Sequence, residues 1–299
     1  MIPYFNRVTQ KIENEQVYGS AWLEWAYRNR FGHFLTDAVF SRRFVSQLFG
    51  MFEDSPLSRS KIPTFVRQYG IQTEDFESRD YRNFNEFFIR KFKPGVRPFA
   101  NTPGVFCAGA EARYLVFEDL KPRQKFKVKG IEIDLVELLG DSSLAPEFEG
   151  GSLILARLCP VDYHRFHFPF TGRLLRHQQV KGRYHSVNPV AFSMEPRVFL
   201  ENERQVAILE NSHFGNVAMI EVGALGVGKI VQSAWSDDTP LPFEFEKGQE
   251  KGYFLFGGST VIWLVQKQKI RLSDDLLKNS SIGLETWIPL GQPLGERIE

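Results

Sequence analysis

The 299-residue chain has few cysteines, almost no net charge and no long apolar run, and each shortage excludes a class of protein. Cys107 and Cys159 can form at most one disulfide, so the fold does not depend on a disulfide framework and suits a reducing compartment. Lys and Arg number 37 against 36 Asp and Glu, so the basic surface typical of nucleic-acid-binding proteins is missing. We therefore expect no nucleic-acid partner.

The sequence also lacks the apolar segments that put a protein into or across a membrane. No stretch approaches the roughly 18 apolar residues of a spanning helix. The start, MIPYFNRVTQKIENEQ, has no apolar core of the kind found in signal peptides. We expect the chain to stay in the cytoplasm unless it binds a membrane from the side.

Aromatic residues, in contrast, are in surplus, with 28 Phe in the chain. Between residues 21 and 52 they recur at spacings of three to five, which is a helical period, with arginines between them. Two interpretations remain open from the pattern: the aromatic faces cover a core, or two amphipathic helices lie in a lipid headgroup layer. The candidate membrane contacts are Trp22, Trp25, Phe31, Phe34, Arg42 and Arg43.

The character of the sequence changes near KPGVRPF, residues 93–99. Before it, IPTFVRQYGI and NFNEFFIRKF predict helices, which Pro94 and Pro98 end. After it, short segments rich in Val, Ile and Phe predict strands of a mostly antiparallel assembly: ARYLVF, GSLILARL, QVAILE, NVAMIEVGALGVGKIV and YFLFGGSTVIWLV. EIDLVELLG predicts a short helix and GDSSLAPEFEGG a loop. We expect an α+β fold in which a helical N-terminal region, 1–83, packs on a β-rich catalytic body, 84–299.

The segment LCPVDYHRFHFPFTG holds Asp162, His164 and His167 within six residues. Two such histidines could bind a metal on one helical turn, but prolines bracket the segment and no third ligand stands out, so we predict no metal site. The histidines are then either structural or groups that transfer protons near pH 7, where imidazole titrates. A metal-dependent hydrolase that uses both histidines is an alternative function.

The segment YFLFGGSTVIWLV interrupts an apolar strand with Gly257, Gly258 and Ser259. Two glycines weaken a strand, so they need a reason. They form a hairpin turn, or they allow a strained backbone in which the Ser259 hydroxyl reaches the Gly258 carbonyl. Spacing alone does not decide, and a non-enzymatic membrane-surface protein is a further alternative.

Longer motifs carry a resemblance to a known family. KGQEKGYFLFGGSTVIWLV, residues 247–265, resembles the C-terminal signature of prokaryotic-type phosphatidylserine decarboxylases, in which a Gly-Ser-Thr marks the bond that the proenzyme cuts by itself. NFNEFFIRKFKPGVRPF and PVDYHRFHFPFTG resemble two other segments of that family. YHSVNP, FLENERQVAIL, FGNVAMIEVGALGVGKI and ETWIPLGQPLG also follow the family's order, so the resemblance covers roughly residues 84–295.

The resemblance implies that the chain cleaves itself between Gly258 and Ser259 by serine-protease-like chemistry and converts Ser259 into a covalent pyruvoyl group. Residues 1–258 are then a β chain and residues 259–299 an α chain, and the two stay associated. The resemblance also implies the activity: phosphatidylserine in a membrane forms an imine with the pyruvoyl group and loses carbon dioxide, which leaves phosphatidylethanolamine.

The same resemblance assigns roles to three more residues. His167 corresponds to the histidine that activates the serine, and His164 is left for the decarboxylation step, either to protonate the product carbon or to shield the site. Glu111, in CAGAEARYLVF, stands where the family usually has an aspartate. Glutamate keeps the carboxylate but is one methylene longer, so the sequence does not decide whether Glu111 orients His167.

A lipid substrate favours the headgroup-layer interpretation of residues 21–52, because the enzyme has to reach a headgroup that is held in a bilayer. We therefore expect a peripheral membrane protein at the cytoplasmic face of the cell membrane. The sequence does not decide between a monomer and a homodimer.

Overall fold

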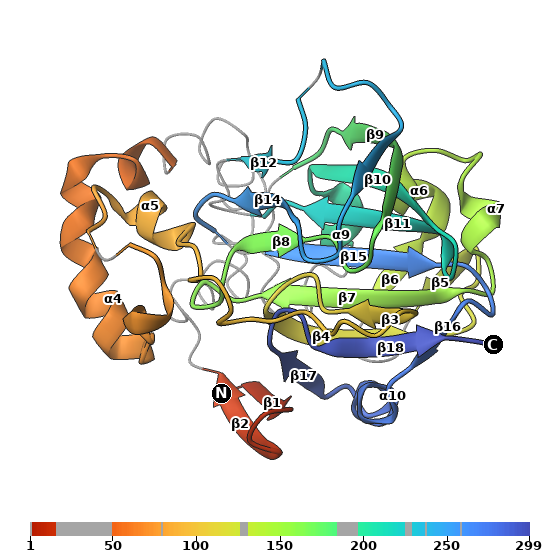
Figure 1. Ribbon diagram of the computed structural model, residues 1–299, viewed down its shortest axis with the longest axis horizontal. Coiled ribbons are helices and arrows are strands. Elements are labelled where there is room, and N and C mark those ends of the chain that lie inside the picture. Colours follow the sequence, from red (N-terminus) through yellow and green to blue (C-terminus); the bar gives the residue numbers. More distant parts are fainter. Residues whose placement is uncertain are drawn as a thin grey trace, which may run out of the picture.

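The structure is a computed structural model, and it describes residues 2–15, 50–78, 80–125, 131–183, 197–224, 229–236, 238–257 and 259–299. Its centre is a ten-stranded sheet that fills the right-hand part of Figure 1. The strands of this sheet are β1 (Ile2–Asn6), β2 (Lys11–Glu15), β4 (Ala112–Phe117), β7 (Ser152–Leu158), β9 (Gly172–Val180), β10 (Arg204–Asn211), β11 (Gly215–Val222), β13 (Phe243–Phe245), β15 (Ser259–Val265) and β17 (Glu285–Ile288). Their spatial order is β13-β9-β10-β11-β15-β7-β4-β17-β1-β2.

Neighbouring strands of the large sheet run antiparallel, except that β1 and β17 are parallel. Three smaller sheets accompany it. They are formed by β8 (Arg165–His167), β12 (Ile230–Gln232) and β14 (Glu250–Phe254); by β3 (Val105–Cys107), β16 (Ile270–Leu272) and β18 (Pro293–Arg297); and by β5 (Arg123–Lys125) and β6 (Glu132–Asp134). The expected mostly antiparallel α+β architecture is confirmed.

The helices of the described residues are short. Besides the helical residues 50–53, they are the 3₁₀ helices η2 (Pro56–Lys61) and η3 (Thr73–Asp75), and the α-helices α4 (Ile62–Tyr69), α5 (Phe84–Phe88), α6 (Leu135–Leu139), α7 (Ala145–Phe148), α9 (Val198–Glu201) and α10 (Asp274–Ser281). Local signals set their ends: Gly70 ends α4 in a left-handed conformation, and the Asn83 side chain caps α5 by accepting from the Glu86 amide. The helices predicted around α4, α5 and α6 are confirmed, whereas the stretch expected as a loop contains α7.

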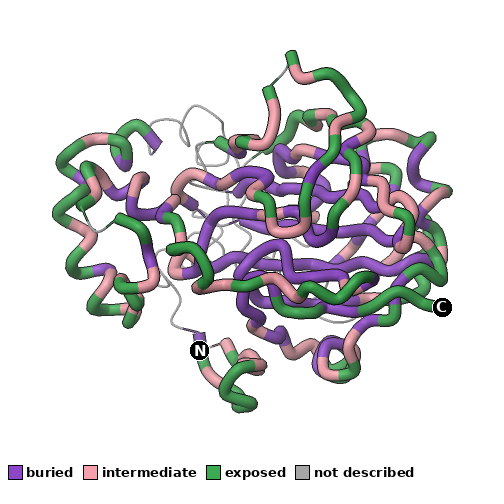
Figure 2. The backbone as a smooth tube through the Cα atoms, viewed as in Figure 1, coloured by how far each residue is buried: buried purple, intermediate pink, exposed green. Residues whose placement is uncertain are grey.

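Helices α4 and α5 lie at one end of the molecule, beside the end of the sheet where β8 and β14 are found (Figure 1). The sheet itself is the core, as the continuous buried strands in Figure 2 show. Every residue of β7 and β15 is buried. An unbroken apolar run is typical of a strand that is covered on both faces. Part of the Phe surplus lies in this interior, where ten of the described Phe residues are at most 1% exposed: Phe84, Phe87, Phe88, Phe106, Phe148, Phe166, Phe168, Phe199, Phe214 and Phe254.

The N-terminal residues 2–15 form a β-hairpin that extends the large sheet, because β1 pairs with β17 near the other end of the chain. The expected helical region 1–83 therefore does not begin at residue 2. The partner strand lies about 280 residues away in the sequence, so local periodicity could not indicate this pairing.

Two predictions fall on residues that the structure does not describe. The proposed membrane contacts between residues 21 and 49 lie there, namely Trp22, Trp25, Phe31, Phe34, Arg42 and Arg43, and so does Gly258. Within the described ranges, no helix combines the length and the apolar character that crossing a bilayer requires.

Candidate active site

Ser259 is the first residue of β15 and pairs with Leu158 of β7. Its side chain is fully buried, and its hydroxyl oxygen has no hydrogen-bond partner among the described residues. Most buried polar atoms in proteins are hydrogen-bonded, so an exception of this kind suggests a functional role. Thr260, the next residue, has a buried hydroxyl in the same condition.

The segment before Ser259 connects two different sheets. Strand β14 pairs with β8 and β12, whereas β15 pairs with β7 and β11. The two strands are not partners, so the interpretation of the glycine pair as a hairpin turn is wrong. Gly257 has a φ of 142°, which side-chain-bearing residues rarely adopt, and this explains why glycine is needed there.

His164 lies in the loop between β7 and β8 and is completely buried. Its Nδ1 is 3.0 Å from the carbonyl oxygen of Asp162, and its Nε2 has no partner in the described part of the chain. Because a carbonyl only accepts, Nδ1 carries the proton and Nε2 presents a free lone pair. Burial, and next the charge of Arg90, lower the pKa of His164 to about 3, so the ring is neutral at pH 7.

The environment of His164 links it to the residues just before Ser259. Its ring lies 3.9 Å from the ring of Phe88, which in turn packs 5.1 Å from Phe256. Its carbonyl oxygen accepts from the amide of Phe254, the last residue of β14. The imidazole is therefore held beside the chain segment that runs into Ser259.

His167 is on β8, and its ring is bound at both nitrogens. Nδ1 lies 2.9 Å from the carbonyl oxygen of Gly248, and Nε2 lies 3.4 Å from the Tyr163 hydroxyl. Burial lowers the pKa of His167 as well. Gly248 has a φ of 82°, and the glycine conformation directs its carbonyl toward the ring.

Glu111, whose role in orienting His167 the sequence left open, is bound by Arg97. Its carboxylate accepts from Arg97, with Nε to Oε2 at 2.6 Å and Nη2 to Oε1 at 3.2 Å, and from the Leu290 amide at 3.4 Å. Among the described residues, no hydrogen bond joins Glu111 to His167. The acceptor on His167 Nδ1 is the Gly248 carbonyl, which the sequence did not single out.

Asp162 organises the turn that carries His164. Its Oδ2 accepts from the Cys159 amide at 2.7 Å and from Arg113 Nη1 at 2.6 Å. Burial raises the pKa of Asp162 to about 6, although Arg113 opposes this. The sequence pointed to Asp162 through its motif, but nothing in the pattern indicated Arg113, which lies 49 positions away.

Arg90 is a second group that the sequence reasoning missed. It is 3% exposed, and its Nη2 donates to the carbonyls of Val161 and Asp162 at 2.8 and 3.0 Å. The Asp162 carbonyl oxygen therefore accepts hydrogen bonds from both Arg90 Nη2 and His164 Nδ1. The signal available in the sequence was its position in FFIRKF, one of the motifs that carry the family resemblance.

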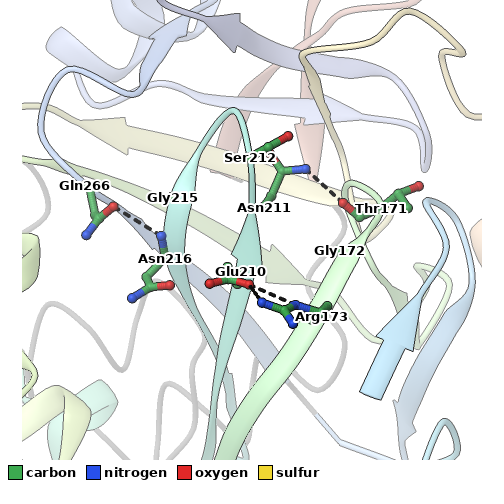
Figure 3. Close-up of a pocket in the computed structure, with 9 residues that line it drawn as sticks. All are labelled: Thr171, Gly172, Arg173, Glu210, Asn211, Ser212, Gly215, Asn216 and Gln266. Carbon is green, nitrogen blue, oxygen red and sulfur yellow. Dashed lines mark hydrogen bonds and ion pairs between the residues drawn. The ribbon is translucent and has the colours of Figure 1, made fainter. Parts of the chain in front are cut away.

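A separate pocket of about 540 Å³ lies at the opposite end of β15 (Figure 3). It includes Gln266, which follows the last residue of the strand, so it is roughly 23 Å from Ser259 at about 3.3 Å per residue. Its polar groups bond one another: the Asn211 side chain donates to the Thr171 backbone carbonyl, and the Asn216 backbone amide donates to the Gln266 side-chain oxygen. We assign no chemistry to this pocket.

No group of three metal-binding side chains occurs in the ranges that the structure describes.

Comparisons with known proteins give the family. Residues 84–288 match the model of the family described as Phosphatidylserine decarboxylase. Proteins named phosphatidylserine decarboxylase proenzyme from Ruminiclostridium cellulolyticum and Clostridium tetani are each 38% identical to this chain, over 100% of it and 99% of their own length. The protein of that name from Fusobacterium nucleatum is 38% identical over 98% of this chain and 97% of its own. The chain therefore belongs to the phosphatidylserine decarboxylase family, a family of carboxy-lyases.

Proposed function

We propose that this chain is a proenzyme that cleaves itself between Gly258 and Ser259 and then decarboxylates phosphatidylserine to phosphatidylethanolamine and carbon dioxide. The observation that carries the proposal is the Ser259 hydroxyl, which is fully buried and unpartnered in the described structure at the start of a core strand. Leaving such a group unsatisfied is costly, so its retention supports a chemical use. The proenzyme names of the relatives support processing.

Self-cleavage begins when Ser259 Oγ attacks the carbonyl carbon of Gly258. The peptide C–N bond breaks, an ester C–O bond forms, and an imidazole moves the hydroxyl proton to the freed amine. Removal of the Cα proton of residue 259 then expels Gly258 as a carboxylate. Addition of water releases ammonia and leaves a pyruvoyl group as the new N-terminus.

The placement of β15 and β17 in the large sheet supports cleavage at Ser259 without separation of the two chains. The strand lies between β7 and β11, both of which belong to residues 1–258. Strand β17 likewise lies between β4 and β1. The hydrogen bonds of these pairs do not depend on the bond between residues 258 and 259, so they support continued association of the α and β chains.

A pyruvoyl group at position 259 would supply a carbonyl that can bond the substrate amine and so provide an electron sink for decarboxylation. The chain's own contribution is to bury that position, exclude water and supply a proton. Each histidine has Nδ1 on a backbone carbonyl, so Nε2 is the ring atom that can take up and pass on a proton, although burial lowers the pKa of both rings. His167 remains the proposed base of self-cleavage and His164 the proposed proton donor of decarboxylation. The unpartnered Nε2 of His164 is the observation that favours the reverse assignment.

Membrane association is part of the proposal. The substrate class lies in a bilayer, and a peripheral enzyme at the cytoplasmic face of the membrane could reach it through residues 21–52. Deleting those residues and measuring sedimentation with anionic liposomes tests this part. Unchanged sedimentation would contradict the assignment.

The mass of the purified protein tests the proposal most directly. We expect two chains, the smaller without a free serine amine, whereas Ser259→Ala yields one uncut and inactive chain. Ser152→Ala is a matched control, because Ser152 is a buried serine at the far end of the neighbouring strand. An active preparation made of one uncut chain would overturn the proposal.

The residue roles are tested by the rate of precursor cleavage. If His167 is the base, His167→Ala abolishes cleavage and His164→Ala preserves it, and the opposite result reverses the two roles. Glu111 as the orienting acid stays a prediction, because its oxygens bind Arg97 here. Glu111→Gln slows cleavage strongly if the prediction is right, and normal processing contradicts it.

A further inference from the structure

The N-terminal hairpin ends in a buried acidic residue close to the His164 loop. Glu15 is the last residue of β2 and is 5% exposed. The hairpin is held on the C-terminal part of the chain by the β1–β17 pairing and by Arg7, whose Nε and Nη2 each lie 2.7 Å from the Asp275 carboxylate. Residues 2–15 are therefore fixed to the β-rich body.

Glu15 is bound by two buried arginines from the centre of the large sheet. Its Oε2 lies 2.7 Å from Arg157 Nη2 and 3.0 Å from Arg113 Nε. Arg157 also binds both oxygens of Glu285, at 2.6 and 2.9 Å. All of these side chains are at most 5% exposed, so the ion pairs are little screened by water.

The cluster continues into the loop that carries His164. Arg113 Nη1 donates to Asp162 Oδ2, which also accepts from the Cys159 amide. The Asp162 carbonyl in turn accepts from His164 Nδ1. Glu15, Arg113, Asp162 and His164 thus form an unbroken series of contacts from the hairpin to the imidazole.

We propose that Glu15 is a positioning residue for the reaction: by holding Arg113, it fixes the Asp162 turn and through it the orientation of the His164 ring. The inference rests on the proposed function of His164. It adds residues 2–15 to the machinery of the site, and it links them through Arg157 and Glu285 to the segment 259–299 that becomes the α chain.

The cluster's charges give the proposal a signature that a purely structural contact lacks. The cluster contains two arginines, Arg113 and Arg157, and three carboxylates, those of Glu15, Asp162 and Glu285. The negative charge of Glu15 repels that of Asp162 and contributes to the raised pKa of Asp162. Removing the Glu15 charge therefore lowers the pKa of Asp162 and shifts any dependent pH profile toward acid. The charged or titratable groups that face Asp162 are Glu15, Arg90, Glu111, Arg113, Cys159 and, more distantly, Tyr4.

The test compares Glu15→Gln with Glu13→Gln in the full-length, processed protein. Glu13 is on the same strand, but its carboxylate binds only Tyr4, Asn6 and Thr9 in the described structure. We expect Glu15→Gln to lower kcat for phosphatidylserine vesicles at least tenfold with KM within twofold, and to shift the acid limb of the kcat profile to lower pH. Glu13→Gln should match the unsubstituted protein.

A second readout does not need activity. Hydrogen exchange at the Cys159 amide, which donates to Asp162, should become at least tenfold faster in Glu15→Gln and stay unchanged in Glu13→Gln. Glu15→Asp keeps the charge and should recover part of both effects if Glu15→Gln folds poorly. Unaltered exchange at residue 159 together with an unaltered pH profile, in either folded Glu15 variant, overturns the proposal. Altered exchange in a chain without decarboxylase activity supports the coupling and instead contradicts the proposed function.

Discussion

The buried ion pair between Lys251 and Glu221 yields a prediction that the structure makes quantitative. Both side chains are 0% exposed, and Nζ lies 2.7 Å from Oε1. Lys251 is on β14 and Glu221 is on β11, so the pair joins a small sheet to the large one. Gln232 bridges them, since it donates to Glu221 Oε2 at 3.0 Å and accepts from Lys251 at 3.2 Å.

The perturbation is Lys251→Met, made in the uncut Ser259→Ala chain so that a single polypeptide unfolds. It leaves the Glu221 carboxylate buried, with the Gln232 side chain as its remaining side-chain donor among the described residues. Removing one partner of a buried pair costs about 3–5 kcal/mol of unfolding free energy. For a chain of this size, 3 kcal/mol lowers Tm by roughly 6–12 °C.

The pH dependence gives the sign of the effect. Burial raises the pKa of Glu221 even with Lys251 present, so without the lysine the folded protein holds a proton on Glu221 more tightly than the unfolded chain does. The stability gained from this bound proton is fully present below about pH 4.3, the pKa of Glu221 in the unfolded chain, and is lost as pH rises through its pKa in the folded protein. The Tm difference should therefore be larger at pH 8 than at pH 5.

Thermal unfolding followed by circular dichroism measures these differences, and Lys251→Met/Glu221→Leu completes the cycle. The double variant removes both charges, so we expect it to recover most of the lost stability. Lys267→Met serves as a control for the loss of a lysine, because Lys267 is exposed. The reasoning is refuted if the single variant is as stable as its parent at pH 8, or if the double variant is less stable than the single one.

Two further predictions concern the histidines. Gly248→Ala should slow the step that uses His167 at least tenfold, measured as a single-turnover rate. The backbone φ of 82° disfavours alanine, and its Cβ would lie 2.9 Å from the Phe99 ring. Both effects would displace the Gly248 carbonyl that binds His167 Nδ1. A normal rate would mean that this carbonyl does not position the ring. The pKa of about 3 for His164 predicts that folding stability falls as pH drops from about 6.5 toward 3, because the unfolded chain takes up that proton first. Denaturation at several pH values should show a smaller fall in His164→Phe than in the unsubstituted chain, and equal falls would contradict the low pKa.

Short-range features could be predicted well from the sequence, because their causes are local. The apolar run in STVIWLV predicted β15, and all seven of its residues are buried in a strand. IPTFVRQYGI predicted α4, whose end at Gly70 follows from the left-handed conformation that glycine allows. The motifs around His164 and Ser259 indicated the family, because each is a contiguous segment that can be recognised without knowledge of the fold.

Contacts between distant segments were decided by the tertiary structure. The strands β1 and β2 depend on pairing with β17, and a local pattern does not contain the partner. The sequence left open whether Glu111 orients His167, and it did not indicate that Arg97 binds Glu111, since which cation reaches a buried carboxylate depends on how the chain folds around it. In the same way, one glutamate of KIENE bonds only its own hairpin, whereas the next, Glu15, enters the cluster of Arg113 and Arg157. Residue type determined the available charges and hydrogen-bonding groups, and only burial and three-dimensional proximity determined which of them became partners.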